Sequence, residues 1–358
     1  MPLIQVSVNP EGVDRARWID QVSRIRGKNS QDACAPIELQ CALCPHRCRM
    51  REGQAGRCGV RVNEKGRPVL PFWGRVSSLA MDPIEKKPLY HFRPGTRVLS
   101  AGFIGCNLIC PFCQNWTISQ STDAVTRLME PLALVTEAER IGTKSLAYTY
   151  SEPLIHFEYL VESMQLARAR GIANILVTNG CLLEGPAREI LALTDAANVD
   201  LKSGKQETYT SVLGGDLETT KRFITLAYEA GVHVEVTTLV VPTLNDSPVE
   251  IDNCADFLSA LSSDIPWHLS AYHADYRWQG PPTDPETLEL MAIRARKKLH
   301  YVYMGNVWGE KNDTHCPECG HSVIHREGYQ IEMKGLRMDT ENSNYACSRC
   351  GAKLPIRQ

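Results

Sequence analysis

The segment GCNLICPFC, residues 105–113, contains three cysteines, Cys106, Cys110 and Cys113, with three and then two residues between them. No fourth cysteine follows nearby. Closed iron–sulfur sites and structural zinc sites normally use four protein ligands. Three thiols so close together therefore predict a [4Fe–4S] cluster with one iron open to a ligand that is not protein. The alternative is a zinc knuckle that takes its fourth ligand from a distant part of the chain.

Composition limits the class of protein. The chain has 358 residues, of which 43% are hydrophobic, enough for one large core and smaller satellites. The net charge is −2 and no long basic run occurs, so no nucleic-acid partner is indicated. We find no apolar stretch of membrane-spanning length and no signal peptide, and we expect a cytoplasmic protein.

The 14 cysteines are grouped rather than dispersed. Eleven of them form three tight sets: Cys41, Cys44, Cys48 and Cys58; Cys106, Cys110 and Cys113; Cys316, Cys319, Cys347 and Cys350. Close spacing among turn residues favours metal ligation in a reducing cytosol over disulfides. We expect the other three, Cys34, Cys181 and Cys254, to be small buried residues.

From about residue 95 to 307, strand-like apolar runs alternate with helical patterns. The expected strands are 98–105, 145–150, 174–178, 198–202, 233–241 and 267–272, with a further candidate at 300–304. This alternation predicts parallel βαβ units and an α/β fold, a partial (β/α)₆ barrel. We predict three domains: an N-terminal Cys-rich metal-binding region (1–70), the barrel (71–310) and a C-terminal zinc ribbon (311–358).

Polar motifs follow the expected strands at one end. The three cysteines, Ser151-Glu152-Pro153, Thr178-Asn179-Gly180 and Asp200-Leu201-Lys202 each come where a strand candidate finishes. Because the carboxyl ends of the parallel strands of a barrel meet on one face, the pattern predicts an active site there.

Several blocks together resemble one known family. CxxxCxxC with an aromatic residue before the last cysteine is the signature of radical S-adenosylmethionine (SAM) enzymes. The wider set resembles the AmmeMemoRadiSam-system radical SAM enzymes, which are similar to pyruvate formate-lyase activating enzymes: residues 82–92, 105–116, 148–153, 240–246 and 303–306. The resemblance implies a radical SAM partial barrel, with genetic association to AMMECR-family and Memo-family proteins.

The resemblance also implies roles for the strand-end residues. Glu152 matches the position that contacts the SAM amine, and Asp200 and Lys202 match a DxK element with Lys202 toward the SAM carboxylate. The motif reads Tyr-Ser-Glu-Pro instead of Gly-Gly-Glu, and Val177 stands where the activating enzymes carry an aspartate. These departures leave the backbone contacts and a bound monovalent cation in doubt.

Each of these residues also has a plain structural interpretation. Glu152 would cap the helix after Pro153, and Lys202 would face solvent.

Four further residues are candidates for cofactor binding. We expect Phe112 to pack near the adenine, Thr178 and Asn179 to bond the ribose or carboxylate, and His268 to reach adenine or substrate. Loop packing for Phe112, an Asn-Gly turn for Asn179 and a packed strand histidine for His268 are the alternatives.

Two CxxC-Gly knuckles near the C-terminus, at Cys316 and Cys319 and at Cys347 and Cys350, form a zinc-ribbon pattern, with a small hairpin expected at 328–333. Four ligands close this site, so its Zn²⁺ should be structural. The N-terminal set, Cys41, Cys44, Cys48 and Cys58, also offers four thiols. Its spacing alone does not separate a Zn²⁺ staple from a second Fe–S cluster, and zinc is slightly favoured.

These observations predict an oxidoreductase or lyase that cleaves SAM reductively to form a 5′-deoxyadenosyl radical, which abstracts hydrogen from a small-molecule or macromolecular substrate. A reductase such as flavodoxin or ferredoxin would supply the electron. The alternative within this class is a glycyl-radical-enzyme activase. The alternative of another class is a zinc-scaffold binding protein without catalysis, in which all eleven grouped thiols bind zinc.

Overall fold

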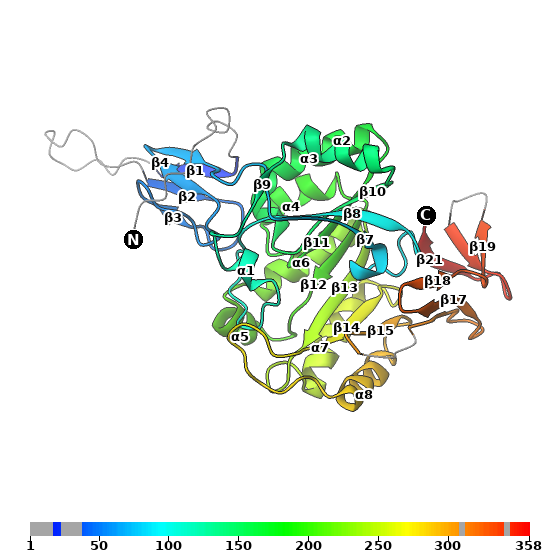
Figure 1. The fold of residues 1–358 in the computed structure, drawn as a ribbon. Helices are drawn as coiled ribbons and strands as arrows, with labels where there is room; N and C mark the ends of the chain where they lie inside the picture. The colour runs from blue at the N-terminus through cyan, green and yellow to red at the C-terminus, as the bar shows by residue number, and fades with distance from the viewer. Residues whose placement is uncertain (1–16, 23–37, 308–311, 340–343) are drawn as a thin grey trace, which may run out of the picture.

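An eight-stranded sheet forms the centre of the computed structural model, which describes residues 17–22, 38–307, 312–339 and 344–358 (Figure 1). Cys34 lies outside the described residues. The strands in chain order are β7 (Ser78–Pro83), β8 (Arg97–Gly102), β10 (Ser145–Thr149), β11 (Ala173–Thr178), β12 (Ala196–Asp200), β13 (His233–Val240), β14 (Trp267–Ala271) and β15 (Val302–Gly305). Their order in the sheet is β15-β14-β13-β12-β11-β10-β8-β7.

All seven expected strands are present, and β8 and β10–β15 pair in parallel. The expectation of a mostly parallel α/β sheet is therefore confirmed. One strand was not expected: β7 pairs with β8 in antiparallel orientation, from Ser78 with Gly102 to Pro83 with Arg97. Sequence order runs along the sheet from β7 to β15, and closure into a barrel remains a prediction.

Helices connect the parallel strands, and contacts of α2, α3, α6 and α8 with β10, β11, β13, β14 and β15 place them along the sheet. The helices are α1 (Trp116–Ser119), α2 (Pro131–Ile141), α3 (Phe157–Ala169), α4 (Glu184–Leu191), α5 (Gln206–Thr208), α6 (Leu217–Glu229), α7 (Pro248–Leu261) and α8 (Pro285–Ala295). Short 3₁₀ turns span Ile84–Lys86 and Pro153–His156, and a π turn spans Tyr209–Leu213.

Side-chain caps explain where the longer helices begin. Asp216, Ser247 and Asp284 each accept a hydrogen bond from the backbone N–H three residues later, so they satisfy donors that the first turns of α6, α7 and α8 leave unpaired. Within the described residues, none of the helices has the length and apolarity needed to cross a membrane.

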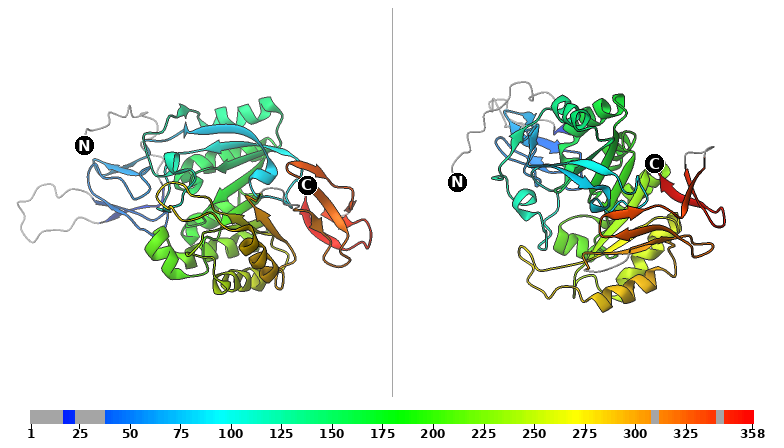
Figure 2. Two further views of the ribbon diagram at one scale, coloured as in Figure 1. Left: turned by 60° about the horizontal axis from the view of Figure 1, so that its bottom comes forward. Right: turned by 45° about the vertical axis from the view of Figure 1, so that its right-hand side comes forward.

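Short strands form the N-terminal part, on one side of the central sheet (Figures 1 and 2). These are β1 (Ile19–Val22), β2 (Glu38–Cys41), β3 (Arg49–Met50), β4 (Val62–Glu64) and β5 (Arg67–Val69); β6 (Arg75–Val76) pairs with β9 (Arg127–Leu128). A buried ion pair joins this part to α3, because Arg61 Nη2 lies 2.5 Å from Glu158 Oε2. Breaking one partner of such a pair leaves an uncompensated buried charge, so the contact holds the two parts together.

The C-terminal strands lie on the opposite side of the sheet from the N-terminal part (Figures 1 and 2). They are β16 (Thr314–His315), β17 (Ser322–Glu327), β18 (Gln330–Glu332), β19 (Leu336–Asp339), β20 (Asn344–Cys347) and β21 (Lys353–Arg357). β17 and β18 form the expected hairpin, with Gly328 at positive φ in its turn. Arg326 anchors this part: it donates to the Tyr90 carbonyl at 2.8 Å and stacks 4.5 Å from the Tyr90 ring.

A buried polar network lies where the C-terminal part meets the sheet. Glu235 accepts hydrogen bonds from the backbone N–H groups of Tyr90 and His91 and contacts the rings of His233 and His268. These contacts hold the pKa of Glu235 well below its usual value although burial acts to raise it. Burial lowers the pKa of His91 to about 3, so this ring, whose Nε2 lies 2.6 Å from Tyr303 Oη, is neutral.

The neutral state of His91 links stability to pH. An unfolded histidine has a pKa of about 6.5, so below that pH the unfolded chain binds a proton that the folded chain rejects. The contribution of neutral His91 to the free energy of unfolding is complete above about pH 6.5. It is lost progressively as the pH falls toward 3. From pH 6.5 to 5, the unfolding free energy of the natural chain should fall by about 1.4 kcal/mol per pH unit more than that of His91→Gln. Urea melts of both proteins check this, and identical pH slopes would contradict it.

Candidate active site

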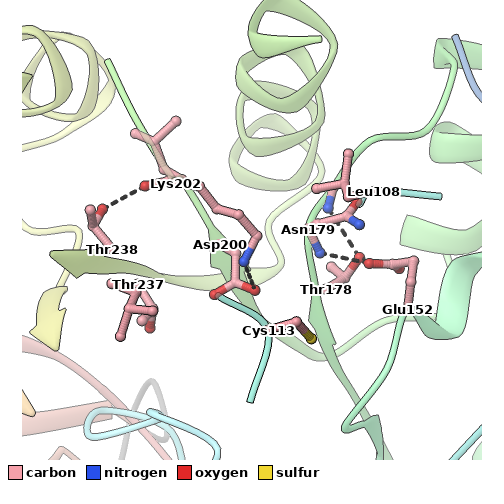
Figure 3. A network of polar contacts seen from close by, with 12 residues as sticks. Leu108, Cys113, Glu152, Thr178, Asn179, Asp200, Lys202, Thr237 and Thr238 are labelled. Atoms are coloured by element: carbon pink, nitrogen blue, oxygen red, sulfur yellow. Dashed lines mark hydrogen bonds and ion pairs between the residues drawn. The ribbon is translucent and has the colours of Figure 1, made fainter. Parts of the chain in front are cut away.

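A cavity of about 490 Å³ opens at the carboxyl ends of the parallel strands. Nine of the predicted site residues line it: Cys106, Cys110, Phe112, Cys113, Glu152, Thr178, Asn179, Asp200 and Lys202. They come from the segments that follow β8, β10, β11 and β12, which are neighbours in the sheet. The parallel register thus brings together residues that are nearly a hundred positions apart in the sequence, and Figure 3 shows several of them around one space.

The cysteine loop leaves β8 through a glycine that no other residue can replace without strain. Gly105 has φ +86°, and a Cβ there would lie 2.6 Å from the Cys58 carbonyl oxygen. Beyond it, the Leu108 N–H donates to Cys106 Sγ at 3.3 Å, and Ser119 Oγ lies 3.1 Å from Cys113 Sγ. Burial raises the pKa of the Cys106 thiol, and it raises that of Cys110 to about 11, partly opposed by Lys202.

Glu152 is a buried carboxylate with neutral neighbours. Its Oε1 accepts from Thr178 Oγ1 at 2.6 Å, and its Oε2 accepts from the Asn179 N–H at 2.8 Å (Figure 3). Oε1 also accepts from the Leu154 N–H at 3.0 Å. The Leu154 bond is the cap of the following 3₁₀ turn, so the capping interpretation of Glu152 holds alongside its place in the cavity. Burial raises the pKa of Glu152 to about 7 against these three bonds. No ion pair with Lys, Arg or His reaches this carboxylate among the described residues.

Asn179 connects this carboxylate to the cysteine loop. Its backbone N–H binds Glu152, while its side-chain Nδ2 lies 2.8 Å from Asn107 Oδ1 and 3.7 Å from Cys106 Sγ. Gly180, at φ +65°, completes the expected turn. Both interpretations of Asn179, a turn residue and a cavity residue, are therefore compatible with its position.

Asp200 and Lys202 form an ion pair on the facing wall, with Lys202 Nζ 2.9 Å from Asp200 Oδ2 (Figure 3). Burial acts to lower the pKa of Lys202, but Asp200 and the Cys110 thiol outweigh it and raise that pKa. The backbone is held as well, because the Lys202 N–H donates to Tyr209 Oη at 3.0 Å and Asn245 Nδ2 donates to the Lys202 carbonyl at 2.7 Å. The lysine is thus a fixed positive charge, and it does not face bulk solvent.

Of the two aromatic residues predicted to contact the cofactor or substrate, Phe112 lines the cavity and His268 does not. Phe112 lines the cavity and also packs against Trp278, with ring centroids 6.4 Å apart. His268 does not line the cavity: it occupies the second position of β14, near the opposite end of the strand, and its Nε2 lies 2.7 Å from Glu235 Oε2. The expectation that His268 reaches adenine or substrate is therefore not supported, and the packed strand histidine describes it.

A second buried charged group lies at this cavity, in residues 82–87, a charged segment whose sequence allows either a solvated turn or a catalytic or phosphate-binding lysine. Lys87, only 2% exposed, pairs with Asp82 at 2.8 Å and lies 4.1 Å from the centroid of the Tyr150 ring, and the Tyr150 hydroxyl donates to the same carboxylate. Lys87 and Tyr150 both line the cavity, and Tyr150 has φ +71°, unusual for a residue with a side chain. A solvated turn describes Lys86, which is exposed, but not Lys87, which is buried.

The C-terminal cysteines form a compact group. The ligand atoms of Cys316, Cys319, Cys347 and Cys350 all lie within 4.8 Å of one another, with sulfur–sulfur distances of 3.6 Å for Cys316 and Cys350 and 3.7 Å for Cys319 and Cys347. Gly320 and Gly351 at positive φ close the two knuckles as expected. This group therefore fits a metal site.

The N-terminal cysteines are arranged differently. Cys41, Cys44, Cys48 and Cys58 line one small hollow, yet no three of their sulfurs lie within 4.8 Å of one another. The same is true of Cys106, Cys110 and Cys113. Of the remaining cysteines, Cys181 and Cys254 are buried as expected.

Known proteins resemble this chain in sequence. The model of the radical SAM superfamily matches residues 102–254. An uncharacterized protein of Methanocaldococcus jannaschii is 38% identical over 325 residues, which are 89% of this chain and 96% of that protein. The pyruvate formate-lyase-activating enzyme of Clostridium pasteurianum is 26% identical over 58% of this chain and 89% of that enzyme.

A solved structure, Streptococcus suis SuiB bound to S-adenosylmethionine, matches with a TM-score of 0.48 and 16% identity, over 62% of this chain and 52% of that one. The superfamily match and the sequence relatives, which include activating enzymes, show that this chain belongs to the radical SAM superfamily of enzymes.

Proposed function

We propose that Cys106, Cys110 and Cys113 hold a [4Fe–4S] cluster whose open iron binds SAM, and that the enzyme abstracts hydrogen from a small-molecule or macromolecular substrate. One observation carries the assignment of residues: three thiols share a cavity with a buried carboxylate, Glu152, and a partly buried lysine, Lys202. When bound, the cluster supplies the electron that cleaves SAM into methionine and a 5′-deoxyadenosyl radical.

The charges in the cavity fit the SAM amino-acid group. Free SAM carries an ammonium and a carboxylate, and a buried charge is stable only when it is paired. Glu152 has three neutral donors and no ion-pair partner among the residues described above, so an ammonium would complete its surroundings. Lys202, which is paired with Asp200, also lines the cavity and would hold the SAM carboxylate.

The other residues act by positioning. Thr178 and Asn179 fix the carboxylate of Glu152, and Asp200 keeps Lys202 charged and oriented. Phe112 supplies an apolar wall suited to adenine. Lys87 and Tyr150 stand on the cavity wall beside Asp82, and we assign them to the substrate rather than to SAM, because the SAM charges are already met.

We favour direct modification of a substrate over a role as glycyl-radical activase, because two additional cysteine modules exceed what activation requires. Tyr329, which is 60% exposed in the turn of the C-terminal hairpin, also lines the cavity, so the C-terminal part has access to a bound substrate. The activase alternative rests on the similarity to activating enzymes. A glycyl-radical EPR doublet after mixing with a candidate partner would support that alternative.

The finer family membership remains part of the proposal. We assign the chain to the AmmeMemoRadiSam system, with AMMECR-family and Memo-family proteins as partners and a flavodoxin or ferredoxin as electron donor. We also retain the partial (β/α)₆ barrel and the division at residues 70 and 310. The described cysteines are free thiols, which fits our placement of the enzyme in the reducing cytoplasm.

We propose that the C-terminal cysteines bind a structural Zn²⁺. Four thiolates at a tetrahedral Zn–S distance of about 2.3 Å stand about 3.8 Å apart. The sulfur–sulfur distances of 3.6 and 3.7 Å match this value. The rival zinc-scaffold protein without catalysis would be colourless and would contain neither iron nor sulfide.

Replacement of Cys110 tests the central assignment. Cys110→Ala removes one of three thiols, so release of 5′-deoxyadenosine from SAM after dithionite reduction should be abolished. Cys254→Ala, which changes a buried cysteine of α7 outside the three sets, is the matched control and should retain release. Anaerobic assay of both purified proteins makes the comparison, and full release by Cys110→Ala would refute the assignment.

Replacement of Glu152 tests the pairing with the SAM amine. A hydrogen bond to a charged group contributes about 1.5–3 kcal/mol, so Glu152→Gln should raise the Kd for SAM about 10- to 100-fold. Glu137→Gln, in an exposed pair with Arg140 on α2, should leave it unchanged. Isothermal titration with SAM under anaerobic conditions gives both values. Equal affinities for the natural chain and Glu152→Gln would count against this role.

Loss of a C-terminal ligand should separate stability from catalysis. Cys347→Ala should reduce bound zinc by about one ion per chain and lower the Tm, because zinc binding stabilises small folds of this kind. Release of 5′-deoxyadenosine by the protein that stays folded should persist. Zinc content that is unchanged in Cys347→Ala would disprove zinc at this site.

A further inference from the structure

The four N-terminal cysteines surround a common space. All four cysteines line one hollow, together with Ile155 from the segment after Glu152. One of the four sulfurs accepts a backbone hydrogen bond, from the Arg57 N–H to Cys48 Sγ at 3.4 Å.

Spacing separates this set from the zinc-like set of the same chain. Two pairs of C-terminal sulfurs lie 3.6 and 3.7 Å apart, and all four sulfurs lie within 4.8 Å of one another, which suits one tetrahedral ion. Among the described residues, the N-terminal sulfurs form no group of three that is this compact. The central cysteines, Cys106, Cys110 and Cys113, share the wider spacing. In an iron–sulfur cluster the thiolates bind different iron atoms, so their sulfurs stand further apart than around a single ion.

We propose that Cys41, Cys44, Cys48 and Cys58 bind a second iron–sulfur cluster instead of zinc. Four cysteine ligands leave no iron open, so this cluster does not bind SAM and is redox-active only. The assignment replaces the slight preference for zinc that spacing along the sequence gave, because sequence spacing does not contain the distances between the folded sulfurs.

The second site adjoins the central cysteine loop. His46, two residues after Cys44, has its Nε2 2.7 Å from the Asn107 carbonyl oxygen, and Asn107 follows Cys106. On the other side, the Cys58 carbonyl packs directly on Gly105. Two segments therefore join the cysteine sets through one hydrogen bond and one backbone contact. Given the proposed function, this contact suits electron supply to the central site.

The test uses the full chain without its central ligands. Cys106→Ala/Cys110→Ala/Cys113→Ala, produced anaerobically, should retain roughly four iron and four sulfide per chain, if the cluster is [4Fe–4S], together with one C-terminal zinc. Iron and sulfide assays, zinc analysis and Mössbauer spectra report on the site without reference to activity. Two zinc ions and no iron in this protein would overturn the proposal.

A second variant removes the N-terminal ligands instead. Cys48→Ser/Cys58→Ser should contain less iron than the natural chain, by the amount that the triple variant retains. It should keep the spectroscopic signal of the central cluster. The EPR spectrum of the reduced natural chain should differ from the sum of the two variants, because adjacent reduced clusters couple. A spectrum equal to that sum would contradict the adjacency. If Cys48→Ser/Cys58→Ser does not fold, the metal content of the triple variant still decides.

The outcomes distinguish this inference from the proposed function. SAM cleavage by the natural chain with no iron in the triple variant leaves the proposed function standing and removes the second cluster. If the triple variant contains iron but the natural chain does not cleave SAM, the second cluster stands and the proposed function is refuted.

Discussion

The parallel register of β8, β10, β11 and β12 is the constraint on which the candidate site depends. Gly102 pairs with Thr149, Tyr148 with Leu176, and Thr178 with Val199, so these strands finish at nearly the same level. Thr178 and Asp200 are the last residues of β11 and β12, and Cys106 and Glu152 lie a few residues beyond β8 and β10. Because side-chain direction alternates along a strand, a slip of one residue would turn these groups away from the cavity. The register therefore sets the distances between cysteines, carboxylate and lysine.

Buried charge gives the strongest physical indication of a ligand. Most buried ionised groups in this structure have a partner: Arg61 has Glu158, Lys87 has Asp82, and Glu235 has two histidine rings. Glu152 has only neutral donors, and burial raises its pKa to about 7. A carboxylate in that position is costly in the free protein and becomes favourable when an ammonium binds. Glu152 is thus a buried carboxylate without an ion-pair partner among the described residues, and it lies at the cavity where the SAM ammonium would supply one.

The three cysteine sets show how one ligand type serves different sites. At the C-terminal site, four sulfurs lie close together in two CxxC-Gly turns, and this arrangement suits a single metal ion. The central loop supplies only three sulfurs, and the N-terminal set supplies four. Among the described residues, neither set contains three sulfurs as compact as those of the C-terminal site. Number and distance together, rather than cysteine content, distinguish these sites. Contacts of Cys58 and His46 with the central loop join two of them into one region.

The sequence alone determined the elements and the types of ligand. Alternation of apolar runs located seven parallel strands, and short-range motifs located the cysteines, Glu152, Thr178, Asn179, Asp200 and Lys202, because hydrophobic period and turn chemistry act over a few residues. The tertiary structure alone decided what depends on contacts between distant segments. It added β7, brought Lys87 and Tyr150 to the cavity, and turned His268 toward Glu235. It also set the separations between sulfurs, which sequence spacing does not contain because the folded path of the chain, and not the number of intervening residues, controls them.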